Sequence, residues 1–170
     1  MTLDEQLSSL VLKATREVIS PAVAASKQMA TTGVCGRIID GQVQIVSKRK
    51  LVGPAFRDAS GALDSTAVFA YVDNALSRPD VDFVLVANEA WMNLLAIPPE
   101  DGADRFSHLQ YGLDGRAEVV ICAIYCQDFQ TAVIHGIRRA GKARLLSPGP
   151  NEFDGVGMGG RFARAEPTRH

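Results

Sequence analysis

The spacing of the hydrophobic positions in this chain changes from that of a helix to that of strands. Across residues 4–19, apolar side chains recur every three or four positions, which is typical of an amphipathic helix. Ser20-Pro21 then predicts a helix stop and a restart, because serine is a good N-cap and proline is tolerated at the first helical position. The alanine-rich residues 22–30 would form a second helix or a kinked extension of the first.

Residues 34–46 predict a β-hairpin. Asp40-Gly41 separates two arms that are rich in β-branched residues, and this dipeptide favours the left-handed conformations of a two-residue type I′ turn. Val43 alternates with polar neighbours in the second arm, which predicts one buried and one solvated face. The basic cluster at residues 48–50 is interpreted as a solvated strand end or loop.

The second half of the chain predicts a series of strands. No side chain is charged from Val119 to Ile124, and such a run is typical of a strand buried on both faces of a sheet. Short turns separate this strand from the next two, which indicates an antiparallel meander. The expected elements are a helix at 64–76, strands at 82–87, 116–126, 131–137 and 143–147, and a long connection at 93–115.

This order of elements predicts the fold class α+β. The expected architecture is a largely antiparallel sheet of about five or six strands, with two or three helices packed on it. We expect residues 1–147 to form a single α+β domain, because 170 residues with a hydrophobic fraction of 46% can bury one core. Residues 148–170 are rich in glycine and proline and are predicted to be a C-terminal tail.

The composition narrows the classes of partner. The chain has 18 Lys and Arg residues against 19 Asp and Glu residues, so its net charge gives no reason to expect nucleic acid as a partner. Its first residues lack the features of a signal peptide, and no apolar run approaches the roughly 20 residues that span a bilayer. Three cysteines without a sign of export predict reduced thiols and a cytoplasmic protein that does not associate with membranes.

No motif predicts catalysis, a metal site or a cofactor. Cys122 and Cys126 would lie about 13 Å apart on a strand, too far to form a disulfide or share a metal. His135 lies within an apolar strand and is interpreted as a structural histidine. The glycine-rich run at 155–160 lacks the flanking strand and helix of a dinucleotide fingerprint. We therefore predict no catalytic residue, no metal ligand and no cofactor.

Five residues are candidates for ligand binding. Glu89 follows a predicted buried strand and Trp91 stands two positions on, so both side chains would point the same way. A carboxylate beside an indole can recognise a base, a sugar or a cationic group, although Glu89 could equally form a structural ion pair with Arg116 or Arg138. His108 lies in the long connection, which could act as a lid. The candidates are Glu89, Trp91, His108, Arg116 and Arg138.

A second basic cluster lies at a predicted hairpin near residues 138–144. Only some of its cations can form one patch, because Arg138 and Arg139 point to opposite faces of a strand. The cluster lacks the aromatic residues on which nucleobases stack, and we interpret it as a solvated sheet edge.

The segment Glu89-Ala-Trp-Met92 after a buried strand, followed by Asp114-Gly-Arg-Ala-Glu-Val-Val120, resembles a pattern in small uncharacterised bacterial and phage proteins. The second element tends to read Asp-Arg-Glu-Glu-Val in those proteins, from which this chain departs. The resemblance covers the middle third of the chain. It implies a bacterial or phage origin and no particular activity.

Three functional hypotheses follow. The first is a non-enzymatic cytoplasmic accessory protein that self-associates as a homo-oligomer and binds a protein or small-ligand partner. It rests on the absence of a catalytic constellation, the alanine-rich helix and the glycine-rich tail. The second is a small enzyme or ligand-binding protein with a pocket around Glu89, Trp91, Arg116 and His108. The third is nucleic-acid binding through the two basic hairpins.

Overall fold

The computed structural model describes residues 2–93 and 109–147 of the chain. Its centre is a six-stranded antiparallel sheet with the strand order β2-β1-β3-β4-β5-β6. This order confirms the predicted hairpin and the predicted meander of later strands. The strands are β1 (Thr32–Ile39), β2 (Gln42–Lys50), β3 (Phe83–Asn93), β4 (Arg116–Tyr125), β5 (Gln130–Ala140) and β6 (Ala143–Leu146).

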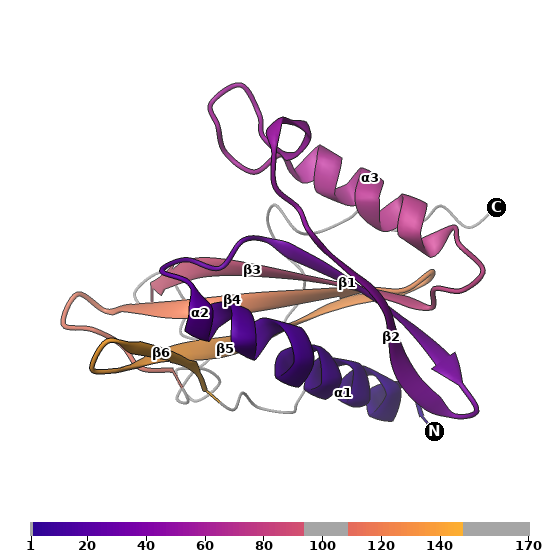
Figure 1. Cartoon of the computed structure of the whole chain (residues 1–170), viewed down its shortest axis with the longest axis horizontal. Helices are drawn as coiled ribbons and strands as arrows, with labels where there is room; N and C mark the ends of the chain where they lie inside the picture. The colour runs from indigo at the N-terminus through magenta and orange to yellow at the C-terminus, as the bar shows by residue number, and fades with distance from the viewer. Residues whose placement is uncertain (1, 94–108, 148–170) are drawn as a thin grey trace, which may run out of the picture.

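Helices cover both faces of this sheet, and the fold class α+β is confirmed (Figure 1). One face carries a continuous helical segment made of α1 (Leu3–Ala14), a π-helical turn (Thr15–Ile19) and the short α2 (Ser20–Ala25). The other face carries α3 (Ser65–Leu76), which is preceded by the 3-10 turn η2 (Pro54–Phe56). Among the described residues, no helix has both the length and the apolar character needed to cross a membrane.

The N-terminal helix begins with a capping box. The Glu5 backbone N–H donates to the Thr2 hydroxyl at 3.3 Å, and the Thr2 backbone N–H donates to the Glu5 carboxylate at 2.6 Å. The apolar stripe of α1 then packs on the sheet, with Leu7 and Leu10 fully buried. The predicted helical periodicity is confirmed for this segment.

The predicted helix stop at Ser20 is wrong, and of the two alternatives for the following residues the structure shows an extension of the first helix. The Ser20 N–H donates to the Thr15 carbonyl, and the chain passes through the π turn into α2 without a side-chain cap. A π turn widens the backbone, which accommodates Pro21 with its missing N–H and bulky ring. The second helical segment also ends at Ala25, five residues before its predicted end.

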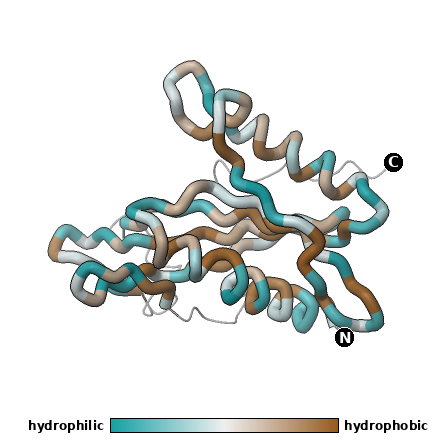
Figure 2. Tube along the Cα trace, in the orientation of Figure 1, coloured by the Kyte–Doolittle hydropathy of each residue, from teal (hydrophilic) through white to brown (hydrophobic). Residues whose placement is uncertain are grey.

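Each face of the sheet has its own hydrophobic core. Hydrophobic segments run along the central strands, and hydrophobic and hydrophilic segments alternate along α1 and α3 (Figure 2). Consecutive residues of β3 divide between the two cores, with Leu85 facing α1 and Val86 facing α3. The central strands are therefore buried on both faces, as the uncharged runs in the sequence predict.

The hairpin has the predicted turn and a bulge that was not predicted. Asp40 and Gly41 have φ angles of 51° and 74°, which is the left-handed pair that a type I′ turn requires. Along β2, Cys35 pairs with Ser47 and its neighbour Gly36 pairs with Ile45, so one β2 residue is extra at this point. The basic cluster at 48–50 forms the exposed end of β2, which confirms its interpretation as a solvated strand end.

Strand β3 is longer than predicted and changes the setting of two candidate residues. It runs to Asn93, so Glu89 and Trp91 are strand residues that pair with Val120 and Glu118 of β4. The predicted tail at 148–170 and most of the long connection, with His108, lie outside the described residues.

Candidate functional site

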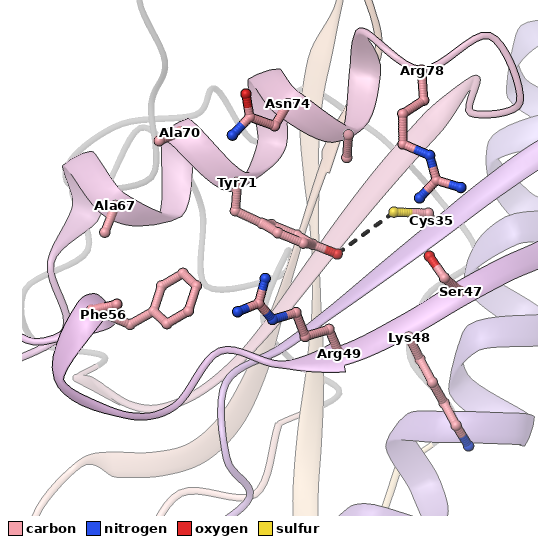
Figure 3. Close-up of a pocket in the computed structure, with 12 residues that line it drawn as sticks. Cys35, Ser47, Lys48, Arg49, Phe56, Ala67, Ala70, Tyr71, Asn74 and Arg78 are labelled. Carbon is pink, nitrogen blue, oxygen red and sulfur yellow. Dashed lines mark hydrogen bonds between the residues drawn. The ribbon is translucent and has the colours of Figure 1, made fainter.

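A pocket of about 620 Å³ lies between α3 and the strands β1 and β2 (Figure 3). It exists because α3 presents small side chains on this side. Ala67 and Ala70 line the pocket, whereas Val68 and Val72 of the same helix are buried in the core. We call this cavity, with Phe56 of η2 at one end, the α3 pocket.

A few polar groups converge in the α3 pocket. The Tyr71 hydroxyl lies 3.6 Å from the Cys35 thiol, and the Ser47 hydroxyl lines the same side (Figure 3). Burial, reinforced by the hydrogen bond with Cys35, raises the pKa of Tyr71 above its ordinary value. Tyr71 therefore stays a neutral phenol that can both donate and accept a hydrogen bond.

The charge around the α3 pocket is positive. The Arg49 guanidinium lies over the Phe56 ring, 5.3 Å from its centroid, and forms no ion pair with a carboxylate of residues 2–93 or 109–147. Arg78 also lines the pocket and is paired at 2.7 Å with Asp80. No Asp or Glu is among the described lining residues. Lys48 also lines the pocket, but its side chain points away from the cavity (Figure 3).

The close approach of Tyr71 to β1 makes Gly33 a sensitive position. A Cβ atom at residue 33 would lie 2.5 Å from the Tyr71 ring, so Gly33→Ala must displace that side chain. We expect this variant to lower the free energy of unfolding by about 1–3 kcal/mol, measured by urea denaturation. Tyr71→Ala removes the clash, so Gly33→Ala should lower the free energy of unfolding clearly less when Tyr71→Ala is already present. An equal cost in both backgrounds would contradict the steric explanation.

Of the predicted ligand-binding residues, Glu89 has a structural position. One carboxylate oxygen pairs with Arg144, and the other accepts a hydrogen bond of 2.7 Å from the Met29 backbone N–H. Arg144 also donates to the Ser26 carbonyl at 2.7 Å. The ion pair thus joins β3 and β6 to the segment that follows α2. The prediction of a structural pair is confirmed, but its partner is Arg144 rather than Arg116 or Arg138.

Trp91 and Arg116 do lie together. The Arg116 guanidinium is 5.6 Å from the centroid of the Trp91 ring, and 60% of the Trp91 surface is exposed. Arg138 is exposed and pairs with Leu145 of β6, and alternation along β5 places it on the opposite face from Trp91. His108 lies outside the described residues. The structure thus brings together two of the five predicted residues, Trp91 and Arg116, in a polar region. Glu89 instead forms a structural ion pair.

The interpretation of the second basic cluster as a solvated edge is wrong for Arg144. Arg144 pairs with Arg139 across the β5–β6 turn, but only 5% of its surface is exposed, because it is buried against Glu89. Arg139 forms an ion pair of 2.6 Å with Glu118. Two of the cations of this cluster are therefore engaged within the protein.

The described thiols and acids make no metal centre. In residues 2–93 and 109–147, no three His, Cys, Asp or Glu side chains gather closely enough to hold an ion. Cys122 is fully buried, and burial raises the pKa of its thiol to about 12, which leaves it protonated and unreactive at neutral pH.

Sequence reasoning missed the α3 pocket. Its lining comes from four separate segments, and neither Tyr71 nor Cys35 belongs to a motif. The available signal was the helical spacing of Ala67, Ala70 and Asn74, small or polar residues on one side of an otherwise apolar helix. Comparison with protein-family models, with curated proteins and with solved structures finds no match to the chain.

Proposed function

We propose that this protein is a non-enzymatic binding protein whose α3 pocket takes a small molecule with an apolar body and an anionic group. The observation that carries the proposal is the combination of a mostly apolar cavity with Arg49, a cation that no described carboxylate neutralises. Cavities of a few hundred Å³ with apolar walls and a few placed polar groups are the usual form of small-molecule sites.

The polar groups of the pocket suit binding better than catalysis. Tyr71 and Ser47 can orient a ligand by hydrogen bonds, and Arg49 can pair with its anionic group. A general base or an activated nucleophile needs a titratable partner at hydrogen-bond distance. Cys35 has instead the hydroxyl of Tyr71, whose raised pKa keeps it protonated.

The test uses 8-anilinonaphthalene-1-sulfonate, which combines aromatic rings with a sulfonate and fluoresces when bound. We expect saturable binding to the native protein. Arg49→Glu should weaken it at least about tenfold, because a charged hydrogen bond contributes about 1.5–3 kcal/mol. Ala70→Phe should also weaken binding by filling the cavity, since Ala70 is an exposed residue of its wall.

Lys50→Glu is the matched control. It makes the same change of charge one residue away on β2 but does not line the pocket. If Lys50→Glu weakens binding as much as Arg49→Glu, the effect reflects general charge and the proposed site is wrong. Independently of these variants, native mass spectrometry of protein purified from its own host would identify a bound natural ligand as a discrete added mass.

Self-association and a cytoplasmic location are further parts of this proposal. The alanine-rich segment offers little apolar surface for self-association. Val23 of α2 faces the core, and Ala24 and Ala25, which are exposed, have small side chains. Sedimentation velocity over a wide concentration range measures the state directly. Nucleic-acid binding is less favoured, since Arg139 and Arg144 are engaged in ion pairs.

A further inference from the structure

A second cavity lies away from the α3 pocket, near the end of the long strands β3, β4 and β5. Its volume is about 420 Å³, and most of its lining side chains are polar or charged. We call it the Trp91 groove. It is lined chiefly by Trp91, Tyr111, Asp114, Arg116, Glu118 and Arg139.

The charges of the Trp91 groove cancel. Two guanidiniums, Arg116 and Arg139, stand against two carboxylates, Asp114 and Glu118. The groove therefore has no net attraction for an anion or a cation, in contrast to the positive α3 pocket. Its planar carboxylate and guanidinium groups present paired hydrogen-bonding atoms, which suit a neutral ligand with several neighbouring hydroxyl groups.

The groove also contains an apolar platform. Trp91 is 60% exposed, with the Arg116 guanidinium 5.6 Å from its ring centroid. An exposed indole flanked by polar groups can pack against the C–H face of a sugar ring while the hydroxyls at the ring edge meet the polar side chains. A flat nucleobase would use the indole but would leave much of this polar rim without partners.

Two enclosed polar atoms beside the groove lack partners. One oxygen of Glu118 accepts from Arg139, but its other oxygen and the Tyr111 hydroxyl make no hydrogen bond within the described part of the chain. Unpaired polar atoms that are shielded from water are costly. Because Glu118 lines the groove, a ligand hydroxyl bound there could supply the missing donor to this oxygen.

We propose that the Trp91 groove is a binding site for a neutral sugar, with Trp91 as the stacking platform and Glu118 as the acceptor of its hydroxyl protons. The site is independent of the α3 pocket, so either can fail without the other. The sugar is recognised by its chemistry, an apolar ring face with hydroxyls at its edge.

The experiment uses intrinsic fluorescence, because Trp91 is the sole tryptophan of the chain. The full-length protein is titrated with D-glucose, D-galactose, D-mannose and N-acetyl-D-glucosamine. We expect at least one sugar to change the Trp91 emission in a saturable way. Glu118→Gln should weaken the binding of that sugar at least about tenfold. Glu17→Gln makes the same change at an exposed position on the helical segment and should leave the binding unaffected.

Three results would overturn the proposal. The first is that none of the four sugars changes the emission of the native protein. The second is that Glu118→Gln, shown by urea denaturation to be folded, binds as tightly as the native chain. The third is that adenosine changes the emission while the sugars do not, which would assign the groove to a nucleobase.

Discussion

Glu89→Ala is expected to lower the free energy of unfolding by about 3–5 kcal/mol, because it leaves the Arg144 charge buried without its counterion. The side chains of Glu89 and Arg144 are only 10% and 5% exposed. The substitution also removes the acceptor of the Met29 N–H. Urea denaturation of the purified variant, followed by circular dichroism, measures the change.

Two comparisons separate the buried charge from other effects. Asp80→Ala removes one partner of an exposed ion pair with Arg78 and should change stability little. Glu89→Leu combined with Arg144→Met replaces the pair with apolar side chains and should recover part of the loss. If the double variant is as unstable as Glu89→Ala, the hydrogen bonds to Ser26 and Met29 matter more than the charge.

The partner of Glu89 illustrates what the sequence can and cannot predict. Alternation places Glu89 and Trp91 on one face of β3, and this prediction depends only on local geometry. The choice between Arg138 and Arg144 depends on the register of β5 with β6 and on the face that each residue takes. Register is fixed by the packing of both strands on the cores, so a single sequence leaves it open.

Local signals were sufficient where a backbone conformation demanded particular residues. The turn at Asp40-Gly41 was predicted because both residues must adopt positive φ, and they do. At Ser20-Pro21 the same reasoning failed, because tertiary packing keeps the helical segment against the sheet on both sides of the proline. Ile19 and Val23 are both fully buried there, and the π turn is the local adjustment that allows it.

The small residues on one side of α3 are a local signal, but the α3 pocket itself was not predicted because a cavity is a property of packing between elements. It depends on how far α3 stands from β1 and β2, which is set by large residues elsewhere in the α3-facing core. The segment between β2 and α3 contributes Phe56 to the pocket, and its sequence has no helical or strand periodicity from which the position of Phe56 could be predicted. By contrast, Trp91 was found as a candidate because it stands two positions after Glu89 at the end of a predicted strand, where alternation places both side chains on one face.

Tyr125→Ala is expected to lower the free energy of unfolding by about 3–5 kcal/mol, as for other buried aromatic residues. Tyr125 lies on β4 beneath α3, is fully buried, and meets Phe69 of α3 edge to face with ring centroids 6.4 Å apart. Its removal leaves a cavity under the helix, so we expect α3 to shift towards the sheet and to change the shape of the α3 pocket. 8-Anilinonaphthalene-1-sulfonate should then bind the α3 pocket more weakly, at protein concentrations and temperatures where the variant is folded.

Phe129→Ala is the matched control for Tyr125, because Phe129 is an aromatic residue four positions later whose surface is 42% exposed. It should cost far less in the same urea denaturation experiment, and it should leave dye binding unchanged. Tyr125→Phe keeps the ring and should retain most of the stability. If Tyr125→Ala loses stability but binds the dye as tightly as the native protein, then α3 keeps its position without Tyr125. Gly33 and Tyr71 would in that case be the contacts that hold the helix over the pocket.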